Sequence, residues 1–206
     1  MMIRAATFLL CAVCAVCAGC GSWSGFGFRA DGREMPLLRE VLTLEAGRVV
    51  ADVGAGEGEL TFALAREVGS TGRVFSTEID PQRLQRLREA FVAARLGNVT
   101  VVEARGSQTG LPPECCDAIV LRRVYHHLND PSAINEGLFR SLRPGGVLAV
   151  IDFPPPFFLS RGQLGVPAKM VVSEVTGSGF KLVRLIDDWP GRGPLASYCV
   201  VLRKPM

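Results

Sequence analysis

Short apolar runs alternate along this chain with segments whose apolar residues recur at helical spacing. The runs predict strands at residues 48–53, 73–79, 99–103, 117–121, 147–153, 181–186 and 198–202. Helices are predicted between them at residues 36–44, 59–68, 81–96, 131–142 and 168–178. Several strands are nearly all apolar, as expected for strands covered on both faces. The alternation therefore predicts an α/β fold with a doubly wound, mostly parallel seven-stranded sheet and helices on both faces.

Two of the predicted helices carry clear start signals. Pro81 and Pro131 each stand at a first helical position, which tolerates a missing backbone N–H. Asp80 and Asp130 precede them, and aspartate is a preferred N-cap residue. We therefore expect both helices to begin at these prolines.

Glycine and proline also predict two loops. Residues 106–116 contain too much of both for a helix, so the connection between the third and fourth strands is predicted to be a loop. The pair Gly145–Gly146 follows Pro144 and predicts a turn before the strand at 147–153. One helix of a full doubly wound sheet is therefore expected to be missing.

The first twenty residues differ from the rest of the chain. Arg4 is their only charge, and residues 5–17 are nearly all apolar. This run is shorter than the roughly 20 apolar residues of a membrane span and is typical of a secretory signal peptide. The predicted organisation is a signal peptide at 1–20, a linker or N-terminal arm at 21–34 and one globular domain at 35–206.

The cysteines refine this picture. Residues 17–20 resemble the bacterial lipobox, with Cys17 in the usual place of leucine, so Cys20 is a candidate for lipidation. We expect an exported protein, periplasmic or a membrane-anchored lipoprotein; the alternative is a cytoplasmic protein that keeps this segment. A metal site at Cys11, Cys14, Cys17 and Cys20 is disfavoured, because only Ala, Val and Gly separate them. Adjacent Cys115 and Cys116 are not expected to bridge each other.

Composition limits the partners. The 206 residues are 48% hydrophobic and 21% charged, which describes an ordinary globular domain with a sizeable core. The net charge is only +3, and no basic stripe is interleaved with aromatic residues, so a nucleic-acid partner is not expected. Membrane contact is expected only through an N-terminal lipid anchor, and the oligomeric state is left open.

The most specific chemistry lies in residues 49–60, VVADVGAGEGEL. A strand runs into Gly54, Ala55, Gly56 and Gly58 directly before a helix, where glycines let the backbone approach a ligand closely. The spacing differs from the G-x-G-x-x-G of dinucleotide sites, and neighbouring glutamates would repel a pyrophosphate. A cofactor with a sulfonium and no phosphate is favoured over a nicotinamide dinucleotide. A glycine turn without a ligand is the alternative.

Acidic residues follow the neighbouring strand. Glu78 lies about 20 positions beyond the glycine loop, where a carboxylate can accept hydrogen bonds from ribose hydroxyls. Asp80 competes for this role but is better placed as a helix cap. Asp52 is expected to organise the glycine loop or to meet the ligand's amino group.

The end of the fourth strand holds the candidates for catalysis. Tyr125, His126 and His127 fall at the carboxyl end of this strand, where open α/β sheets bind ligands. Either histidine could act as a base or orient an acceptor; the alternative is that one of them only packs against the sheet. Two adjacent histidines are too few for a metal site. Asp152 is a further candidate for the rim of the site.

These motifs resemble the class I S-adenosylmethionine-dependent methyltransferase family over about residues 35–204. VADVGAGEGEL is similar to its first motif, TEIDP to its ribose motif, LPPECCDAIVLRRVYHHLNDP to its fourth-strand motif and LRPGGVLAVIDF to the motif of its fifth strand. The resemblance implies a Rossmann-like fold with S-adenosyl-L-methionine as cofactor. The cofactor-binding residues would be Asp52, Gly54, Ala55, Gly56, Gly58, Glu78, Ile79, Ser107 and Arg122.

One position departs from the family. Many members carry an aspartate for the adenine amino group shortly before the Leu-Pro pair, and here Ser107 stands nearest that place. A neutral hydroxyl accepts a weaker hydrogen bond than a carboxylate does. Residues 154–159, three prolines followed by aromatics, are predicted to form a stiff loop, either a hydrophobic lip of the site or a plain connection.

The leading hypothesis is an enzyme that transfers a methyl group from S-adenosylmethionine to a small-molecule or lipid-like acceptor. Methyl transfer requires above all that the acceptor atom be aligned with the donor. The alternative is an exported, non-catalytic binding protein that has the same fold, because a fold alone does not establish a function.

Overall fold

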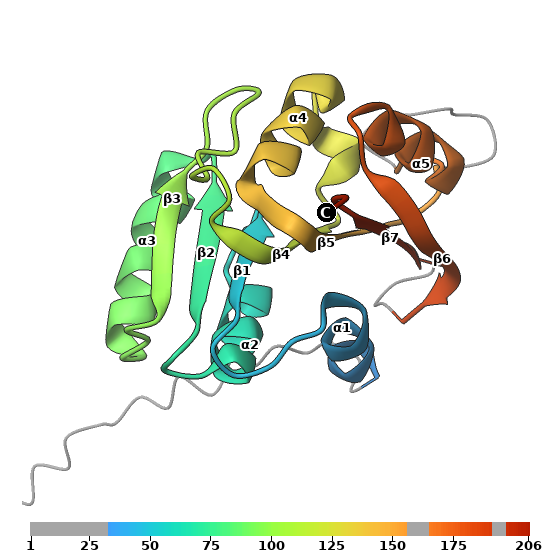
Figure 1. Ribbon diagram of the computed structural model, residues 1–206. Helices are drawn as coiled ribbons and strands as arrows, with labels where there is room; N and C mark the ends of the chain where they lie inside the picture. The colour runs from blue at the N-terminus through green and yellow to red at the C-terminus, as the bar shows by residue number, and fades with distance from the viewer. Residues whose placement is uncertain (1–32, 156–164, 191–196) are drawn as a thin grey trace, which may run out of the picture.

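A computed structural model describes residues 33–155, 165–190 and 197–206 (Figure 1). Its seven strands form one sheet in the order β3-β2-β1-β4-β5-β7-β6. The strands are β1 (Val49–Val53), β2 (Arg73–Glu78), β3 (Val99–Glu103), β4 (Cys116–Arg122), β5 (Leu142–Asp152), β6 (Lys181–Trp189) and β7 (Ser197–Arg203). The helices are α1 (Glu34–Leu42), α2 (Glu59–Val68), α3 (Pro81–Ala93), α4 (Pro131–Ser141) and α5 (Ala168–Gly177), with a short 3-10 turn η1 (Tyr125–His127).

The order of the strands determines where a ligand can bind. β1 pairs in parallel with β2 on one side and with β4 on the other, and β3 and β5 extend these two halves in parallel. Only β7 runs antiparallel to its neighbours, between β5 and β6. The chain thus turns to opposite sides after β1 and after β4, and open α/β sheets bind ligands at the carboxyl ends of such strands.

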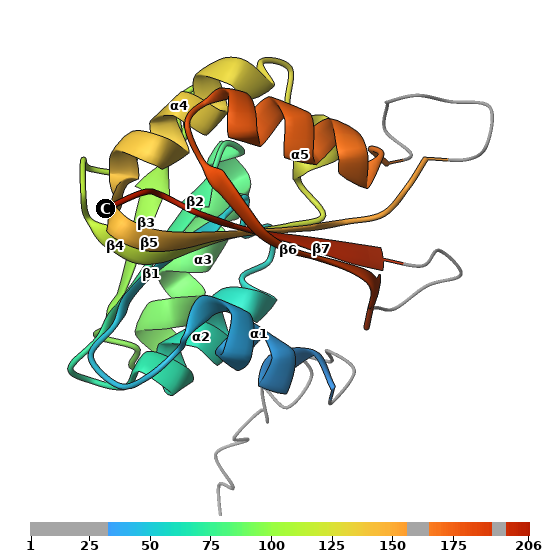
Figure 2. The ribbon, with the colours of Figure 1, turned by 45° about the vertical axis from the view of Figure 1, so that its right-hand side comes forward.

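Helices cover both faces of the sheet. In Figure 2, α4 and α5 lie over one face, and α1, α2 and α3 lie over the other. Side chains of β4 alternate between these two layers, with Ile119 and Leu121 in the core beneath α4 and α5. Ala118 and Val120 contribute to the core beneath α1 and α2. All four are completely buried, which explains why β4 reads as a continuous apolar run.

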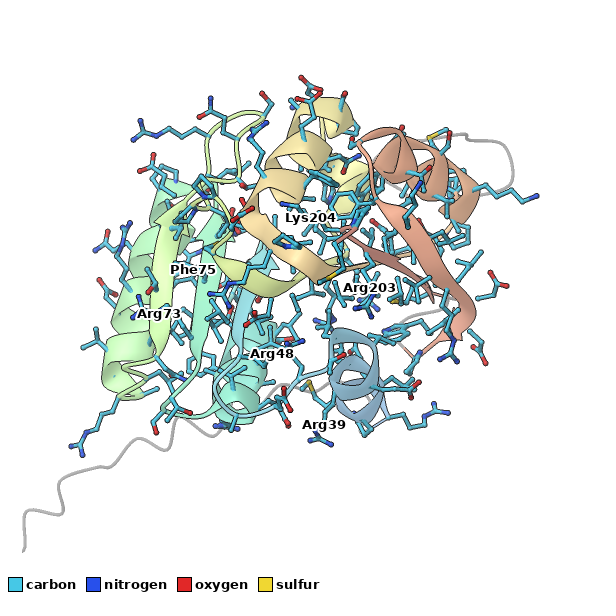
Figure 3. All side chains as sticks on the ribbon, viewed as in Figure 1. Arg39, Arg48, Arg73, Phe75, Arg203 and Lys204 are labelled. Carbon is cyan, nitrogen blue, oxygen red and sulfur yellow. The ribbon has the colours of Figure 1, made fainter. Side chains whose placement is uncertain are left out.

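Exposed charges join the outer elements. Arg39 of α1, labelled in Figure 3, donates two hydrogen bonds to the Glu67 carboxylate of α2, at 2.7 and 2.9 Å. Such exposed ion pairs contribute little to stability, because solvent screens them. The buried apolar layers therefore hold the helices in place.

The structure confirms the predicted α/β fold. Every expected strand and helix is present, with bounds that differ by a few residues, and the connection after β3 contains no helix. Asp80 caps α3 by accepting a hydrogen bond from the Arg83 N–H at 2.8 Å. Asp130 caps α4 in the same way, with the Ala133 N–H at 3.1 Å.

The predicted turn at Gly145–Gly146 is wrong, because these residues lie inside β5. This strand begins at Leu142, opposite Cys116, and its pairing with β4 then shifts before Val147. Gly145 has φ +76° and donates its N–H to the Lys204 carbonyl, while Lys204 returns an N–H to the Gly146 carbonyl. The backbone bonds from the C-terminal segment extend the strand through the glycines.

The N-terminal predictions fall outside the described residues. They are the signal peptide, the lipidation site at Cys20 and all but the last two residues of the linker, and they stay predictions. The same holds for most of the loop at 154–159. Among the described residues, no helix combines the length and the apolar character needed to cross a bilayer.

A buried leucine of α4 tests this packing. Leu138 is 0% exposed, so Leu138→Ala is expected to lower the free energy of unfolding by about 2 to 5 kcal/mol through lost contacts and a cavity. Leu182→Ala is the matched control, because Leu182 is 46% exposed and its loss should cost about 0.5 kcal/mol or less. Denaturant unfolding measures both values. Equal effects in the two variants would contradict the assignment of Leu138 to the core.

Candidate functional site

The glycine loop turns through three left-handed residues. Gly54, Gly56 and Gly58 have φ values of +74°, +57° and +80°, a region that costs other residues roughly 1 to 2 kcal/mol. A Cβ on Gly54 would lie 2.6 Å from Val124, and one on Gly58 would lie 2.7 Å from Leu87. A Cβ on Gly56 would meet no atom within 4 Å. Two glycines therefore serve packing, and Gly56 leaves its backbone open to the space in front of the loop.

The Glu78 carboxylate fixes this loop to the end of β2. Its Oε2 accepts the Gly56 N–H at 3.0 Å, and its Oε1 accepts the N–H groups of Ile79 and Asp80 at 2.8 and 3.1 Å. The residue is only 4% exposed. Arg83 lies 3.8 Å from Oε2 and supplies a positive charge. The carboxylate is thus held rigidly, and of the about four lone-pair sites that its two oxygens offer, the three N–H groups leave one open, on Oε2.

Asp52 lies beneath the loop, away from solvent. Its Oδ2 accepts the Thr61 hydroxyl at 2.6 Å, and the Thr61 oxygen lies 3.0 Å from the Ser76 hydroxyl. Burial raises the pKa of Asp52 to about 6, although the Thr61 hydrogen bond and the charge of Arg122 lower it. Asp52 therefore ties β1 to α2 and does not line the open site.

Arg122 reaches the same region from the end of β4. It donates two parallel hydrogen bonds to the Glu34 carboxylate, from Nε at 3.0 Å and from Nη2 at 3.1 Å. Glu34 is buried at the start of α1 and also accepts the Trp189 indole N–H at 3.2 Å. This cluster joins α1, β4 and β6 behind the site.

The loop, the turn after β2 and the segment after β4 enclose a cavity of about 800 Å³. Its wall includes Gly54, Ala55, Gly56, Glu78, Ile79, Arg122 and His127. Ile79 is 66% exposed and offers an apolar surface beside Glu78. Another cavity, of about 440 Å³ between α3 and β3, contains none of the predicted site residues. The structure thus brings most of the predicted cofactor residues to one place.

The two histidines have different positions. His126 is buried, and its Nδ1 lies 2.8 and 3.0 Å from the two oxygens of Asp152, which is 0% exposed. Asp152 also accepts the His126 backbone N–H at 3.1 Å. His127 lies at the cavity wall, with its ring centroid 3.9 Å from that of His126. Burial, followed by the charge of His126, lowers the pKa of His127 and favours its neutral form.

Besides Asp52 and His126, three predicted site residues lie outside the cavity wall. Tyr125 is fully buried, and its hydroxyl donates to Glu174 at 3.0 Å and accepts from Asn135 at 2.8 Å, so it serves the core. Gly58 faces α3. Ser107 is half-buried in the loop after β3, and its neighbours Gly106 and Gln108 line the cavity in its place.

Two residues that support the site, Glu34 and Thr77, were not identified from the sequence. The linker predicted at 21–34 includes Glu34, but α1 begins at this residue; an acidic residue just before an apolar helical pattern is a usual sign of a first turn. Thr77 lines the cavity, and its carbonyl accepts the N–H groups of Gly54 and Ala55 at 3.0 and 2.9 Å. No sequence signal marked Thr77, because its role depends on the pairing of β1 with β2.

The arrangement suits a ligand that offers hydroxyl donors to Glu78 and a flat apolar group to Ile79. A carboxylate accepts such hydroxyls strongly, because the bonds are charge-assisted. Glu57, next to the loop, adds a second carboxylate, whose Oε1 lies 3.2 Å from Arg86 Nη2. These residues therefore fit a nucleoside with a cationic end better than a pyrophosphate.

Comparison with known proteins agrees with this geometry. The sequence model of a family described as "Methyltransferase domain" matches residues 51–150. The ubiquinone/menaquinone biosynthesis C-methyltransferase UbiE of Marinomonas sp. (strain MWYL1) is 32% identical over 114 residues, which cover 55% of this chain and 45% of that protein. The chain thus spans about half the length of the curated relatives that it matches.

Solved structures share the fold. A SAM-dependent methyltransferase from Aquifex aeolicus superposes with a TM-score of 0.72 at 24% identity, over 85% of this chain and 90% of that one. The [4+2]-cyclase SpnF has a TM-score of 0.72 at 16% identity, over 84% of this chain and 80% of that one. These likenesses concern the fold, which hosts more than one chemistry.

The burial of Asp52 predicts a pH dependence of stability. Its folded pKa of about 6 lies above the ordinary 3.8, so the folded state binds the proton more tightly, and the free energy of unfolding falls as pH rises through this window. Asp52→Asn should not show this fall in the free energy of unfolding, because asparagine does not titrate. Each pKa unit is worth about 1.4 kcal/mol, and a small part of the loss has occurred by pH 4, so the variant should gain about 2 kcal/mol on the wild type from pH 4 to pH 7. Denaturant unfolding across this range measures the gain. Parallel stability curves would contradict the raised pKa.

Proposed function

The chain carries, over residues 51–150, a domain of the class I S-adenosylmethionine-dependent methyltransferase family, and from this premise we propose that its cavity binds S-adenosylmethionine for methyl transfer to a small or lipophilic acceptor. The observation that carries the proposal is the Glu78 carboxylate, buried at the cavity wall and oriented by three backbone N–H groups. In this proposal the lone pair that these N–H groups leave open on Glu78 Oε2 accepts a ribose hydroxyl, and the Ile79 side chain covers the adenine.

The glycine loop supports the same placement. Because a Cβ on Gly56 would meet nothing within 4 Å, the backbone at this position can contact the ligand directly. The amino-acid end of the cofactor carries an ammonium and a carboxylate. We place it toward the start of the loop, where Asp52 lies beneath the wall and Arg122 forms part of it.

The acceptor would enter from the other side of the cavity. Val124, Leu128 and Ile134 give this part of the wall an apolar character, and His127 adds one polar group. The UbiE protein of Marinomonas is named for methylation at carbon in quinone biosynthesis, which supports a lipophilic acceptor for this chain as well. The volume of about 800 Å³ falls within the range of ligand pockets, about 300 to 1,000 Å³.

The chemistry required of the protein is modest. The cofactor supplies an activated methyl group on its sulfonium, and the protein must align the acceptor with it. We propose that His127 takes a proton from acceptors that must lose one, since its lowered pKa keeps the imidazole neutral near neutral pH. Asp152 would hold the His126 ring, whose tilted contact, at 45° between the ring planes, would position the His127 ring.

A charge-neutral variant of Glu78 tests cofactor binding. Glu78→Gln should weaken binding of S-adenosylhomocysteine about 10- to 100-fold, because hydrogen bonds to a charged group are worth about 1.5 to 3 kcal/mol. Glu103→Gln is the matched control: Glu103 pairs with Glu78 in the sheet register but lies outside the cavity wall. Calorimetric titration gives the affinities, and circular dichroism checks the fold of each variant. Wild-type affinity in folded Glu78→Gln, or no binding by the wild type, would refute the proposed site.

A second variant separates binding from catalysis. His127→Ala should leave cofactor affinity unchanged and lower kcat by roughly 100-fold or more, if the acceptor must lose a proton to a base. The assay follows label from methyl-labelled S-adenosylmethionine into the organic phase with reduced quinones that lack a ring methyl group. Asn129→Ala, at the same wall, is the control and should keep kcat. Unchanged kcat in His127→Ala would exclude His127 as the base.

A further inference from the structure

Two adjacent cysteines meet at the start of β4, at the end of the sheet opposite the cavity. The Sγ atoms of Cys115 and Cys116 are 2.7 Å apart. Successive side chains of a regular strand point to opposite faces, so this contact requires a bent backbone. Cys116 and Arg122 are the first and last residues of β4, roughly 20 Å apart at about 3.3 Å per residue. The pair is therefore remote from the proposed methyl-transfer chemistry.

One arginine holds the backbone on both sides of the pair. Arg143 Nε donates to the Glu114 carbonyl at 3.2 Å, and Arg143 Nη1 donates to Asp117 Oδ1 at 2.6 Å. Glu114 has φ +47°, and its N–H donates to the Arg140 carbonyl at 2.9 Å. Glu114 and Asp117, on either side of the pair, are thus both tied to one side chain of β5, and the pairing of β4 with β5 is irregular between Cys116 and Ala118. This irregular start of β4 is where the two thiols make contact.

The two thiols differ in access and in charge. Cys116 is fully buried, whereas Cys115 is half-buried. The hydrogen bond from the Cys116 thiol lowers the pKa of Cys115 despite its partial burial, and the charge of Arg143 contributes. The same contact and burial raise the pKa of Cys116. Cys115 is thus the thiol that reacts with a reagent from solvent, because the thiolate is the nucleophile.

We infer that Cys115 and Cys116 form a vicinal dithiol site that low-molecular-weight disulfides oxidise reversibly to a disulfide between the two neighbours. The Cys115 thiolate attacks one sulfur of the reagent and displaces the first reagent thiolate, which leaves a mixed disulfide on Cys115. The Cys116 thiol loses its proton to water and attacks the Cys115 sulfur, which displaces the second reagent thiolate. Two cysteine thiols are oxidised by two electrons, and one disulfide is reduced to two thiols.

Neighbouring cysteines are not expected to bridge, because a trans peptide holds their Cα atoms about 3.8 Å apart and a disulfide usually spans about 4.4 to 6.8 Å. The contact between these two sulfurs nevertheless favours ring closure to a strained, readily reduced disulfide over a lasting mixed disulfide. A disulfide bond is about 2.05 Å long, so the observed separation leaves little movement to complete. The attacking Cys116 thiol also lies on the next residue, already in contact with its target. The inference does not rest on cofactor binding, and its outcome is independent of the proposed function.

Peptide mapping of the full chain tests the site. The folded protein is treated with oxidised glutathione, free thiols are blocked with iodoacetamide, and the chain is digested with trypsin. Cleavage after Arg105 and Arg122 releases residues 106–122, in which Cys115 and Cys116 are the only cysteines. We expect this peptide to carry no alkyl group and to be lighter by two hydrogens than the reduced peptide. When the protein is treated with reductant before blocking, the peptide should carry two alkyl groups. A doubly alkylated peptide without reductant, or a stable glutathione adduct, would overturn the inference.

Single variants assign the order of attack. Cys116→Ser should stop at a glutathione adduct on Cys115, and Cys115→Ser should stay unmodified, because the remaining thiol is buried. Equal rates of adduct formation in both variants would contradict Cys115 as the attacking thiol. Cys199 is 0% exposed and reports on the fold, since it should be alkylated only after unfolding. If Cys199 stays unalkylated while Cys115 and Cys116 no longer react with iodoacetamide, the reaction took place in the folded chain.

Discussion

The Glu78 carboxylate accepts hydrogen bonds from Gly56, Ile79 and Asp80, and these bonds tie the glycine loop after β1 to the turn after β2. A nearly buried carboxylate would be costly without partners, so the three N–H groups stabilise the charge and fix its direction. The parallel pairing of β1 with β2 makes the contact possible, because it brings the carboxyl ends of both strands to one edge. The cavity wall is therefore a direct consequence of the sheet order.

A second set of charges supports the site from behind. Glu34 of α1 receives both the Arg122 guanidinium and the Trp189 indole, so the first helix and an edge strand are bound to the end of β4. Arg122 in turn offsets part of the cost of burying Asp52. Because these contacts join positions up to 155 residues apart, the site depends on the fold as a whole. At the cavity wall, Asp152 holds the His126 ring, and the His127 ring lies against it at a tilt of 45°.

The sequence predicts those features that depend on local pattern. Apolar runs define the strands, since a strand buried on both faces must be apolar throughout, and the left-handed glycines identify the loop because other residues are strained there. The site also needs directions that no local pattern contains. Tyr125 and His126 lie next to His127 in sequence, yet the 3-10 turn directs the first two into the interior and leaves His127 at the wall. The strand through Gly145 likewise depends on backbone bonds from Lys204, far along the chain.

The account makes one central claim: the cavity between the glycine loop and Glu78 holds S-adenosylmethionine with its ribose on that carboxylate. A crystal structure of the protein with S-adenosylhomocysteine measures this most directly. The account predicts a ribose hydroxyl within hydrogen-bond distance of Glu78 Oε2, the adenine against Ile79 and the sulfur facing the side of the cavity that holds His127. Density for the ligand elsewhere, or a ribose without contact to Glu78, would contradict it.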